Sequence, residues 1–486
     1  MVPPTRRTVL QTLGTTGIAS LAGCPSLSTN NNYGEQPPDS LGTTWSSPAS
    51  EWRYPRRGLQ NTARSSTGFQ EQSTVDWQAH EQSTEEGGRE STHLAVATRE
   101  TVILGTENEN GLNLTAYHAT DGTRRWSRQL RDSEPLYPQF GGLVDGTLYL
   151  TDYETDVIAV DVSGGTVRWR VNLYDRVADD VPEQYLTRPN TSPERFAPVP
   201  TATPSCVYVQ TSYGLHGLVP EDGRERWRLY LGDELEDDRI LQDPGGLAVT
   251  DHRVLMSYAR PEQLLLGIRQ HDGEPVVDRT SVSVRYPNSP LVTGNGTTAL
   301  DSGIIWSTDA SGTLATGAAG TRSVRWQFEG GASNGAAAFS SLAYDGTRVF
   351  VCEGHEKPAE FVVFALRAKT GGLEWMHRES ISDSGIVLSD DADLRVGHPA
   401  VADGTLLVGY GDRSEHGSDA GTLLALATTE GSRRWRTGLS VAPSDIAPTE
   451  TGIYVSGHRG GISRLTENQG ESPAVYRGDE SDTILH

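Results

Sequence analysis

The chain has 486 residues and a net charge of −23, from 64 acidic and 41 basic residues, and its only lysines are Lys357 and Lys369. This charge argues against a nucleic-acid partner, because neutralising phosphates requires a basic surface. An acidic, lysine-poor composition is typical of proteins in high salt, where screening reduces self-repulsion. A halophilic source, such as an archaeon, is therefore expected, with an ordinary acidic secreted protein as the alternative.

The remaining composition favours an all-β fold. Hydrophobic residues make up 35% of the chain and glycines number 53. Short apolar runs separated by Gly and Pro are typical of strands and turns, and no long amphipathic helical pattern is present.

The first 24 residues have the pattern of an export signal. Arg6 and Arg7 precede a weakly apolar stretch, which ends in the sequence Leu-Ala-Gly-Cys at Cys24. This stretch of about 14 residues is too short to span a bilayer, which takes about 20. The arginine pair resembles a twin-arginine signal and the final four residues resemble a lipobox, so lipid attachment at Cys24 is expected. Residues 25–50, rich in Ser, Thr, Asn, Pro and Gly, are expected to form a flexible tether to a folded part at 51–486.

A repeat occupies most of the remaining chain. The sequence TDGTRRW ends at Trp126 and TEGSRRW ends at Trp435, and a degenerate copy, HDGEPVV, ends at Val277. Further copies end at Trp169, Trp227, Trp326 and Trp375. A spacing of roughly 50 residues in a strand-rich chain predicts propeller blades of four strands each. Asp-Gly pairs at Asp145, Asp345 and Asp403 predict tight hairpin turns within the blades.

The tryptophan of each copy is expected to dock flat on a neighbouring blade, where a small opposing residue admits the indole. Ten residues before each copy's last residue stand Ala116, Ala159, Gly217, Gly267, Thr316, Ala365 and Ala425. The predicted docking residues are Trp77, Trp126, Trp169, Trp227, Trp326, Trp375 and Trp435.

An eighth unit is incomplete at the C-terminal end of the chain. Residues 446–465 supply three strands, and residues 73–78 with Trp77 supply the fourth, which would bring both ends of the repeat region into one blade. The alternative fourth strand is PAVYRG, which contains Tyr476. The prediction is an all-β, eight-bladed propeller from about residue 70 to 470.

No residue pattern predicts catalysis or metal binding. Cys206 and Cys352 lie in strand-like sequences and are expected to be buried core residues. His398, before Pro399 at the entrance of a strand, is expected to be a satisfied polar residue in the central tunnel. No Ser/His/Asp set, no zinc-ligand spacing and no phosphate loop is recognisable.

The repeats VIAVDVSGGTVRW and LLALATTEGSRRW resemble the quinoprotein-type β-propeller family, whose members carry pyrroloquinoline-quinone-like repeats. The resemblance covers about residues 51–470, and residues 51–68 resemble the segment before the ring in secreted members. The family resemblance implies one of two functions. One is a dehydrogenase that binds pyrroloquinoline quinone with calcium, and the other is a cofactor-free scaffold, such as the lipoprotein of outer-membrane protein assembly. The dehydrogenases typically carry adjacent cysteines, and this chain has none.

Two further features bear on the dehydrogenase alternative. Trp306 is a possible quinone-stacking residue, but as a residue of a second strand it is expected in the blade core. The acidic residues 390–393 lack the full pattern of a calcium loop. No cofactor is therefore expected, and quinone with calcium stays as the alternative.

The long connections are expected on one face of the ring. They join second strands to third strands, or fourth strands to the first strand of the next unit, and in a propeller both kinds of connection open on the same face. They cover residues 172–197, 230–243, 353–360, 379–397 and 409–421. Insertions on one face usually mark a binding surface. The sequence therefore predicts a non-catalytic, membrane-anchored extracytoplasmic scaffold for membrane or extracytoplasmic proteins. A quinone-dependent dehydrogenase or a small-ligand-binding propeller is the alternative.

Overall fold

The structure is a computed structural model. It describes residues 32–34, 48, 51–55, 62–80, 91–108, 111–132, 138–152, 156–178, 199–230, 242–249, 253–260, 264–271, 274–281, 291–293, 296–301, 304–308, 324–329, 338–356, 358–384, 394–412, 420–458, 460–467 and 474–477. The signal residues Arg6, Arg7 and Cys24 lie outside these ranges.

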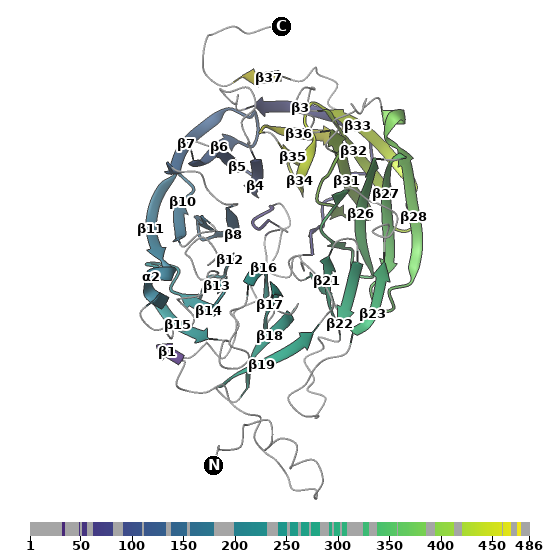
Figure 1. Ribbon diagram of the computed structural model, residues 1–486. Helices are drawn as coiled ribbons and strands as arrows, with labels where there is room; N and C mark the ends of the chain where they lie inside the picture. Colours follow the sequence, from purple (N-terminus) through teal and green to yellow (C-terminus); the bar gives the residue numbers. More distant parts are fainter. Residues whose placement is uncertain are drawn as a thin grey trace, which may run out of the picture.

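The described strands form eight sheets, which stand around a central axis (Figure 1). We number the sheets 1 to 8 in chain order. Sheet 1 contains β4 (Ser91–Ala97), β5 (Thr101–Asn108), β6 (Gly111–His118) and β7 (Arg124–Arg131). Sheet 2 contains β8 (Gln139–Val144), β9 (Thr147–Thr151), β10 (Asp156–Asp161) and β11 (Thr166–Asn172). Sheet 3 contains β12 (Val199–Ala202), β13 (Val207–Thr211), β14 (Gly214–Leu218) and β15 (Glu225–Tyr230).

The middle sheets follow the same order. Sheet 4 contains β16 (Gln242–Val249), β17 (Arg253–Arg260), β18 (Leu264–His271) and β19 (Glu274–Ser281). Sheet 5 contains β20 (Leu291–Thr293), β21 (Gly296–Asp301), β22 (Ile304–Thr308) and β23 (Val324–Glu329). Sheet 6 contains β24 (Ala338–Phe339), β25 (Ala343–Tyr344), β26 (Arg348–Glu356), β27 (Ala359–Arg367) and β28 (Leu373–Ser380). The short strands β24 and β25 both pair with β26 and together take the place of a first strand.

The last two sheets complete the ring. Sheet 7 contains β29 (Leu394–Val396), β30 (Ala400–Ala402), β31 (Thr405–Asp412), β32 (Ala420–Ala427) and β33 (Arg433–Leu439). Sheet 8 contains β34 (Pro443–Thr449), β35 (Gly452–Gly457), β36 (Ile462–Glu467) and, from the N-terminal part of the chain, β3 (Ser73–His80). The first strands lie nearest the axis and the fourth strands form the rim (Figure 1). This all-β arrangement of antiparallel sheets around an axis is a β-propeller.

Three short strands extend individual sheets. β1 (Asn32–Gly34) lies within the segment expected to be a tether and pairs antiparallel with β15. β2 (Arg64–Ser65) pairs parallel with β30. Of the two fourth strands that the sequence left open for sheet 8, β3 pairs antiparallel with β36, and β37 (Ala474–Arg477), which contains Tyr476, adds parallel to the outside of β3.

Two of the three Asp-Gly pairs form the two-residue hairpin turns that the sequence predicts. At Asp345 the turn is longer: residues 345–347 join β25 to β26, and of the pair only Gly346 has a positive φ, of 110°. Asp145 and Gly146 have φ values of 46° and 73°, and Asp403 and Gly404 have 35° and 78°. Positive φ at both central residues is the mark of a type I′ turn, whose twist matches that of the two strands it joins. Two-residue turns therefore join β8 to β9 and β30 to β31, as the sequence predicts.

Five tryptophans of the fourth strands contact the next sheet through a hydrogen bond and a glycine. Six indoles donate Nε1–H to a backbone carbonyl at 2.8 to 3.3 Å: Trp77 to Ala119, Trp126 to Val162, Trp169 to Pro220, Trp326 to Ala368, Trp375 to Thr428, and Trp435 to Phe69. The first five acceptors each lie three residues before a turn glycine of φ between 69° and 72°, namely Gly122, Gly165, Gly223, Gly371 and Gly431. Each indole lies 2.5 to 2.7 Å from the point where a Cβ of that glycine would stand. The turn therefore requires glycine at this position for two reasons: the positive φ, and the space that the indole occupies where a Cβ would stand.

The prediction that a small residue of the neighbouring sheet faces each indole is wrong. The small residues do not oppose a neighbouring sheet's tryptophan but pair across the strands with the tryptophan of their own sheet. These pairs are Ala116 with Trp126, Ala159 with Trp169, Gly217 with Trp227, Ala365 with Trp375, and Ala425 with Trp435. A small side chain there leaves room for the indole, which then reaches the turn glycine of the next sheet.

Sheets 4 and 5 depart from the expected pairing. Gly267 pairs with Asp278, and Val277 pairs with Ile268. In sheet 5 the partner of Trp326 is Ser307, and Thr316 lies outside the described residues. Trp306 belongs to β22, the third strand of its sheet rather than the second, because β20 and β21 already supply the first two.

The indole contact at the turn predicts a difference between two glycine variants. Gly223→Ala introduces a methyl group at positive φ and against Trp169, whereas Gly146→Ala, at a similar φ of 73°, meets nothing within 4 Å. Gly146→Ala is expected to cost about 1–2 kcal/mol of unfolding free energy from the backbone alone. Gly223→Ala is expected to cost about 1–3 kcal/mol more, from overpacking. Urea denaturation followed by tryptophan fluorescence measures both, and equal losses would show that the indole does not rest on the turn.

Candidate functional site

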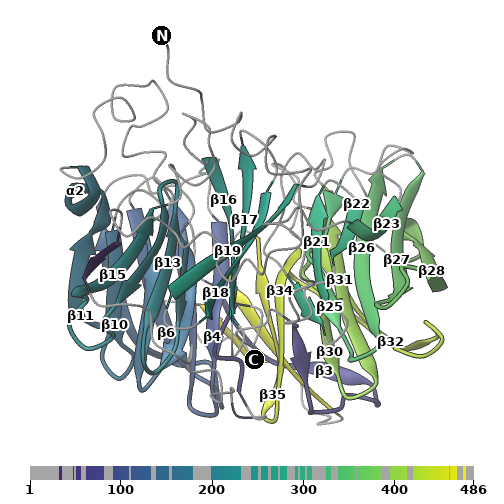
Figure 2. The same ribbon diagram turned by 90° about the horizontal axis from the view of Figure 1, so that it is seen from below.

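The antiparallel order gives the ring two different ends. Connections between first and second strands and between third and fourth strands lie at one end, which we call the turn end. Connections between second and third strands and from each sheet to the next lie at the other, which we call the loop end. The strands run between these two ends (Figure 2). All the long connections singled out in the sequence therefore start and finish at the loop end.

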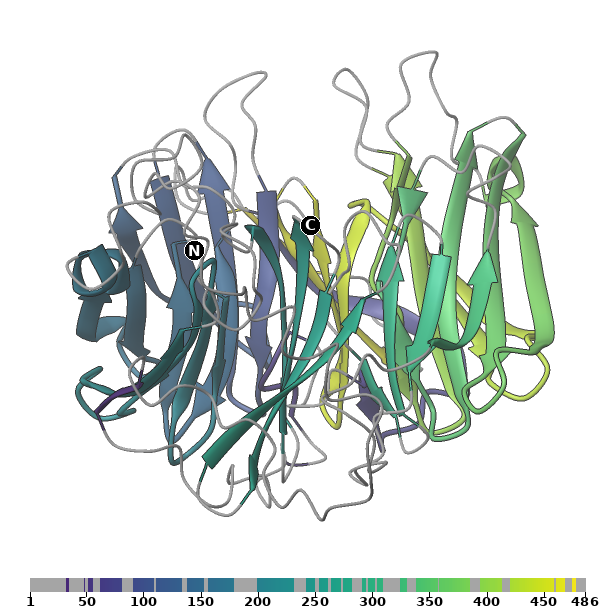
Figure 3. The ribbon, with the colours of Figure 1, turned by 60° about the horizontal axis from the view of Figure 1, so that its bottom comes forward.

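Most of these connections lie partly outside the described residues. Of residues 172–197 the structure describes the part through α2 (Leu173–Ala178), which lies at the rim beside β11 (Figure 3). Of residues 379–397 it describes the part through η4 (Ile381–Ser384) and the part from Leu394. The acidic residues 390–393 lie outside the described residues, as do 231–241 and 413–419.

At the turn end, residues 51–55 run along the inner edges of sheets 1 to 3. Trp52 and Ala97 exchange backbone hydrogen bonds of 2.6 and 2.8 Å. The amide of Leu143 donates to the carbonyl of Arg53 at 2.7 Å. The hydroxyl of Tyr54 donates to the carbonyl of Ala202 at 2.6 Å. We call residues 51–55 and 62–69 the strap.

The second part of the strap contacts sheets on the other side of the axis. The amide of Tyr344 donates to the carbonyl of Thr62 at 3.0 Å, and that of Val401 donates to Ala63 at 2.8 Å. The carbonyl of Phe69 then accepts the indole of Trp435 in place of a turn carbonyl. The strap thus ties sheets 1, 2 and 3 to sheets 6 and 7 at the turn end. The loop end carries no such segment in the described part of the chain.

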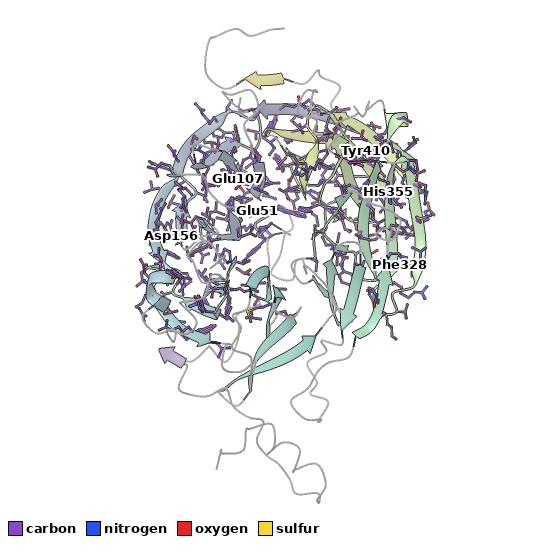
Figure 4. The ribbon with its side chains drawn as sticks, viewed as in Figure 1. Glu51, Glu107, Asp156, Phe328, His355 and Tyr410 are labelled. Atoms are coloured by element: carbon purple, nitrogen blue, oxygen red, sulfur yellow. The ribbon has the colours of Figure 1, made fainter. Side chains whose placement is uncertain are left out.

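The loop end carries buried acidic residues that the sequence analysis missed. Glu107, Asp152, Glu353 and Asp412 stand at or near the ends of the second strands of sheets 1, 2, 6 and 7, and their exposed fractions are 7%, 3%, 0% and 5%. Glu107 and His355, the neighbour of Glu353, lie on opposite sides of the axis (Figure 4). The signal is an apolar run that leads to an acid, as in VILGTE, and it recurs toward the end of the second strand in these four sheets.

Basic side chains accompany three of these carboxylates. Arg131 of sheet 1 donates to Asp152 of sheet 2 at 2.8 Å. His355 Nε2 lies 3.4 Å from Glu353 Oε2, and His93 Nε2 lies 3.9 Å from Glu107 Oε1. Burial opposes charge on His93, but the carboxylates of Glu107 and Asp445 outweigh it and raise the pKa of His93. These pairs fix the strand ends from which the loops leave.

His398 connects three first strands near the axis. Its Nδ1 accepts the hydroxyl of Ser341 in sheet 6 at 2.8 Å, and its amide donates to the carbonyl of Ser444 in sheet 8 at 2.7 Å. These contacts agree with the expected role of a satisfied polar residue.

Sheet 3 contains a geometry that resembles a catalytic triad. His216 Nδ1 lies 2.7 Å from Glu225 Oε1, and Nε2 lies 3.1 Å from Thr211 Oγ1. Thr211 has an exposed fraction of 0%, and its hydroxyl also accepts the amide of Tyr213. The hydroxyl is therefore a buried structural group that a substrate does not reach.

The two cysteines and the possible metal ligands of the described residues lie apart from one another. Cys206 and Cys352 are free, buried and in different sheets, and burial raises the pKa of Cys206 to about 12. No group of three or more His, Cys, Asp or Glu in the described part of the chain is placed to hold a metal ion.

Glu379 fixes the start of one long connection. Its carboxylate, 7% exposed at the residue level, lies 3.1 Å from Arg436 and 3.4 Å from Arg433, both on β33 of the next sheet. Burial would raise the pKa of Glu379, but His377 and the two guanidinium groups outweigh it and hold the pKa below its usual value.

Comparison with known proteins agrees with the class that the fold defines, a β-propeller of the pyrroloquinoline-quinone-like type. The family model described as outer membrane protein assembly factor BamB matches residues 131–288 and 216–472. The chain belongs to this family. No curated protein sequence matches the chain significantly.

Solved structures show the same fold at low identity. BamB from Moraxella catarrhalis is 15% identical with a TM-score of 0.47, and the match covers 82% of this chain and 99% of that one. The quinohemoprotein alcohol dehydrogenase ADHIIG from Pseudomonas putida HK5 is 11% identical with a TM-score of 0.55, covering 90% and 82%. The quinohemoprotein alcohol dehydrogenase from Comamonas testosteroni is 9% identical with a TM-score of 0.54, over the same shares. In the described ranges, no helix has the length and apolar character needed to cross a membrane.

The ion pairs of Glu379 predict a pH-dependent stability. A lowered pKa contributes stability above the unfolded-state value of about 4.3, and this contribution is lost as the pH falls through the folded-state value. Glu379→Gln is expected to lower the unfolding free energy at pH 7 by about 1–2 kcal/mol, because the arginines are partly exposed. In urea denaturation the difference from wild type should persist down to about pH 4.3 and disappear as the pH falls through the folded-state value. Glu360→Gln, which removes an exposed pair with Arg378, is the control and should change stability by less than about 0.5 kcal/mol.

Proposed function

We propose that the protein is a membrane-anchored extracytoplasmic scaffold that binds other proteins through its loop end and catalyses no reaction. The observation that carries the proposal is the difference between the two ends. The strap occupies the inner edges at the turn end, whereas the five long connections singled out in the sequence leave from the loop end. One connection of similar length, residues 309–323 between β22 and β23, leaves from the turn end. Membership of the family described as outer membrane protein assembly factor BamB supports protein binding as the role.

The architecture proposed for this role is an eight-bladed propeller with tryptophans docked between blades. The eight sheets would be the blades, and β3 with Trp77 would close the ring. A rigid ring holds several loops in one fixed array, which suits recognition of a protein surface.

Location outside the cytoplasm is proposed from the sequence before the ring. Arg6 and Arg7 would direct export by the twin-arginine route, Cys24 would carry the lipid, and residues 25–50 would tether the ring to the membrane. β1 adds that the tether contacts the rim at β15, eight residues beyond Cys24. An acidic surface and two lysines support a halophilic source, where high salt screens the charge.

A quinone-dependent dehydrogenase is the second candidate, favoured by the fold of the two alcohol dehydrogenases. Without adjacent cysteines or a described calcium set, we propose that the protein works without this cofactor. Reconstitution with pyrroloquinoline quinone and calcium tests this proposal. Quinone absorbance that stays with the protein through gel filtration, together with dye reduction by alcohols or sugars, would establish the dehydrogenase instead.

The scaffold proposal predicts that shortening two loops abolishes partner binding. Residues 180–197 and 385–393 are replaced by short Gly-Ser linkers, which leaves α2 and Glu379 in place. The variant should melt within a few degrees of wild type but recover no partners from solubilised membranes at high salt. Wild type and the Gly146→Ala variant, changed only at the turn end, should recover the same proteins. The proposal fails if the loop variant recovers those proteins too, or if wild type recovers none.

The anchor predicts that Cys24→Ser moves the protein from the membrane fraction to the soluble extracytoplasmic fraction. Intact mass of the wild-type membrane form should correspond to a chain that begins at Cys24 with lipid attached. Replacing Arg6 and Arg7 by Lys should block export while leaving synthesis unchanged. Secretion at wild-type level by that double variant would contradict the twin-arginine route, and an uncleaved mature chain would contradict the anchor.

A further inference from the structure

β1 joins the N-terminal segment of the chain to the rim of the ring. It pairs antiparallel with β15, the fourth strand of sheet 3, so that Asn32 stands opposite Leu229 and Gly34 stands opposite Trp227. Because the fourth strands form the rim, this contact lies on the outside of the ring (Figure 1). β1 thus extends sheet 3 at its outer edge, as extended segments do when they add a strand to a sheet.

The direction of β1 shows from which end of the ring the chain reaches sheet 3. Fourth strands run from the turn end to the loop end, because each one follows the turn after a third strand and precedes the connection to the next sheet. Leu229 therefore lies nearer the loop end than Trp227 does. Since Asn32 stands opposite Leu229, the chain enters β1 on the loop-end side and runs toward the turn end, where the strap lies. The residues before Asn32 are thus joined to the loop-end side of the rim.

The number of residues before β1 limits the distance between this part of the rim and Cys24. Asn32 follows Cys24 by eight residues. A chain of eight residues spans at most about 29 Å, even when it is fully extended. Trp52, which the strap joins to Ala97 near the axis, follows Cys24 by 28 residues, and that length spans up to about 100 Å. β1 therefore replaces a long connection to the inner edge of the turn end with a short connection to the rim.

One of the long connections begins at the same part of the rim. α2 starts the connection of residues 172–197, and the guanidinium of Arg228 on β15 donates to the carbonyl of Arg176 in α2 at 3.2 Å. In return, the guanidinium of Arg176 donates to the carbonyl of Gly223, also at 3.2 Å. Arg228 is the residue of β15 that stands opposite Tyr33 of β1. α2 and β1 are therefore both held by β15, and a surface close to β1 is also close to α2.

We propose that β1 orients the ring on the membrane, with the rim at sheet 3 held nearest the lipid and the loop end turned toward the membrane surface. The kind of partner that fits this orientation is a protein embedded in the same membrane, because the loop end then faces it and α2 is among the parts of the ring closest to it. This inference rests on the proposed function, since it requires the lipid on Cys24.

Energy transfer to a membrane acceptor measures the orientation. The lipidated mature protein is reconstituted in vesicles of phosphatidylcholine and phosphatidylglycerol that contain a lipid with an acceptor dye on its headgroup. A donor dye is attached to one introduced cysteine: Asp175→Cys in α2, Glu221→Cys at the turn end of sheet 3, Ser382→Cys at the loop end of sheet 6, or Glu430→Cys at the turn end of sheet 7. All four residues are exposed, whereas Cys206 and Cys352 are buried. Transfer should be highest for Asp175→Cys, at least about threefold lower for Glu430→Cys, and intermediate for the other two.

Two matched double variants test whether β1 causes the orientation. Asn32→Pro with Tyr33→Pro removes two backbone N–H groups from β1, so the four labels should then transfer within about 1.5-fold of one another. Asn32→Ala with Tyr33→Ala keeps both N–H groups and should keep the wild-type order. Both changes lie outside the eight four-stranded sheets, so both variants should fold. The proposal is overturned if the proline variant keeps the wild-type order of transfer, or if the four labels transfer alike in the wild-type protein.

Intact mass and flotation with the vesicles, measured first, separate this proposal from the proposed anchor. A chain that carries no lipid and does not float contradicts the anchor, and it overturns the orientation together with it. A lipidated chain that floats, but whose four labels transfer alike, overturns the orientation alone and leaves the anchored scaffold in place.

Discussion

The docking of an indole on the turn glycine of the next sheet is the interaction on which the ring depends. The covalent chain alone does not fix the angle between two neighbouring four-stranded sheets. The indole contact fixes it, because the indole ring fits only over a residue without a Cβ and its N–H bonds to the carbonyl three residues before that glycine. Both conditions are met at one turn, so the contact sets the position and the orientation of the next sheet together.

The residue before the tryptophan makes a hydrogen bond to the start of the second strand in several sheets, although the residue types differ between the copies of the repeat. Arg168 and Arg434 donate to Thr147 and Thr405, at the start of the second strand of their own sheets. In sheet 6 the two positions are exchanged, so that Glu374 before the tryptophan accepts from Arg348 at 2.6 Å. A partly exposed pair of this kind contributes little stability by itself. It fixes the register of the outer strand, and the direction of the hydrogen bond is free to reverse.

Ring closure has two components with different mechanical roles. β3 completes sheet 8 and brings distant parts of the chain into one sheet, as is required to remove free sheet edges. The strap then joins the inner edges of sheets on both sides of the axis, and Tyr54 rests against Gly142, where a Cβ would lie 2.2 Å from its ring. This reinforcement lies at the turn end of the ring. At the loop end, buried acids with basic partners hold the strand ends from which the loops leave.

The sequence by itself determined the all-β class, the four-strand unit, the Asp-Gly hairpins and the strand that carries Trp77, because period, turn residues and apolar runs are local signals. It also led to the buried cysteines and to a satisfied His398. Only the tertiary structure decided what each indole touches, since the small residue ten positions earlier and the turn glycine of the next sheet are equally plausible partners along the chain. Likewise, the path of the strap, the buried acids at the loop end and the place of Trp306 on a third strand depend on contacts between residues far apart in sequence. Such contacts are set by how sheets pack around an axis, and no local pattern of residues records that packing.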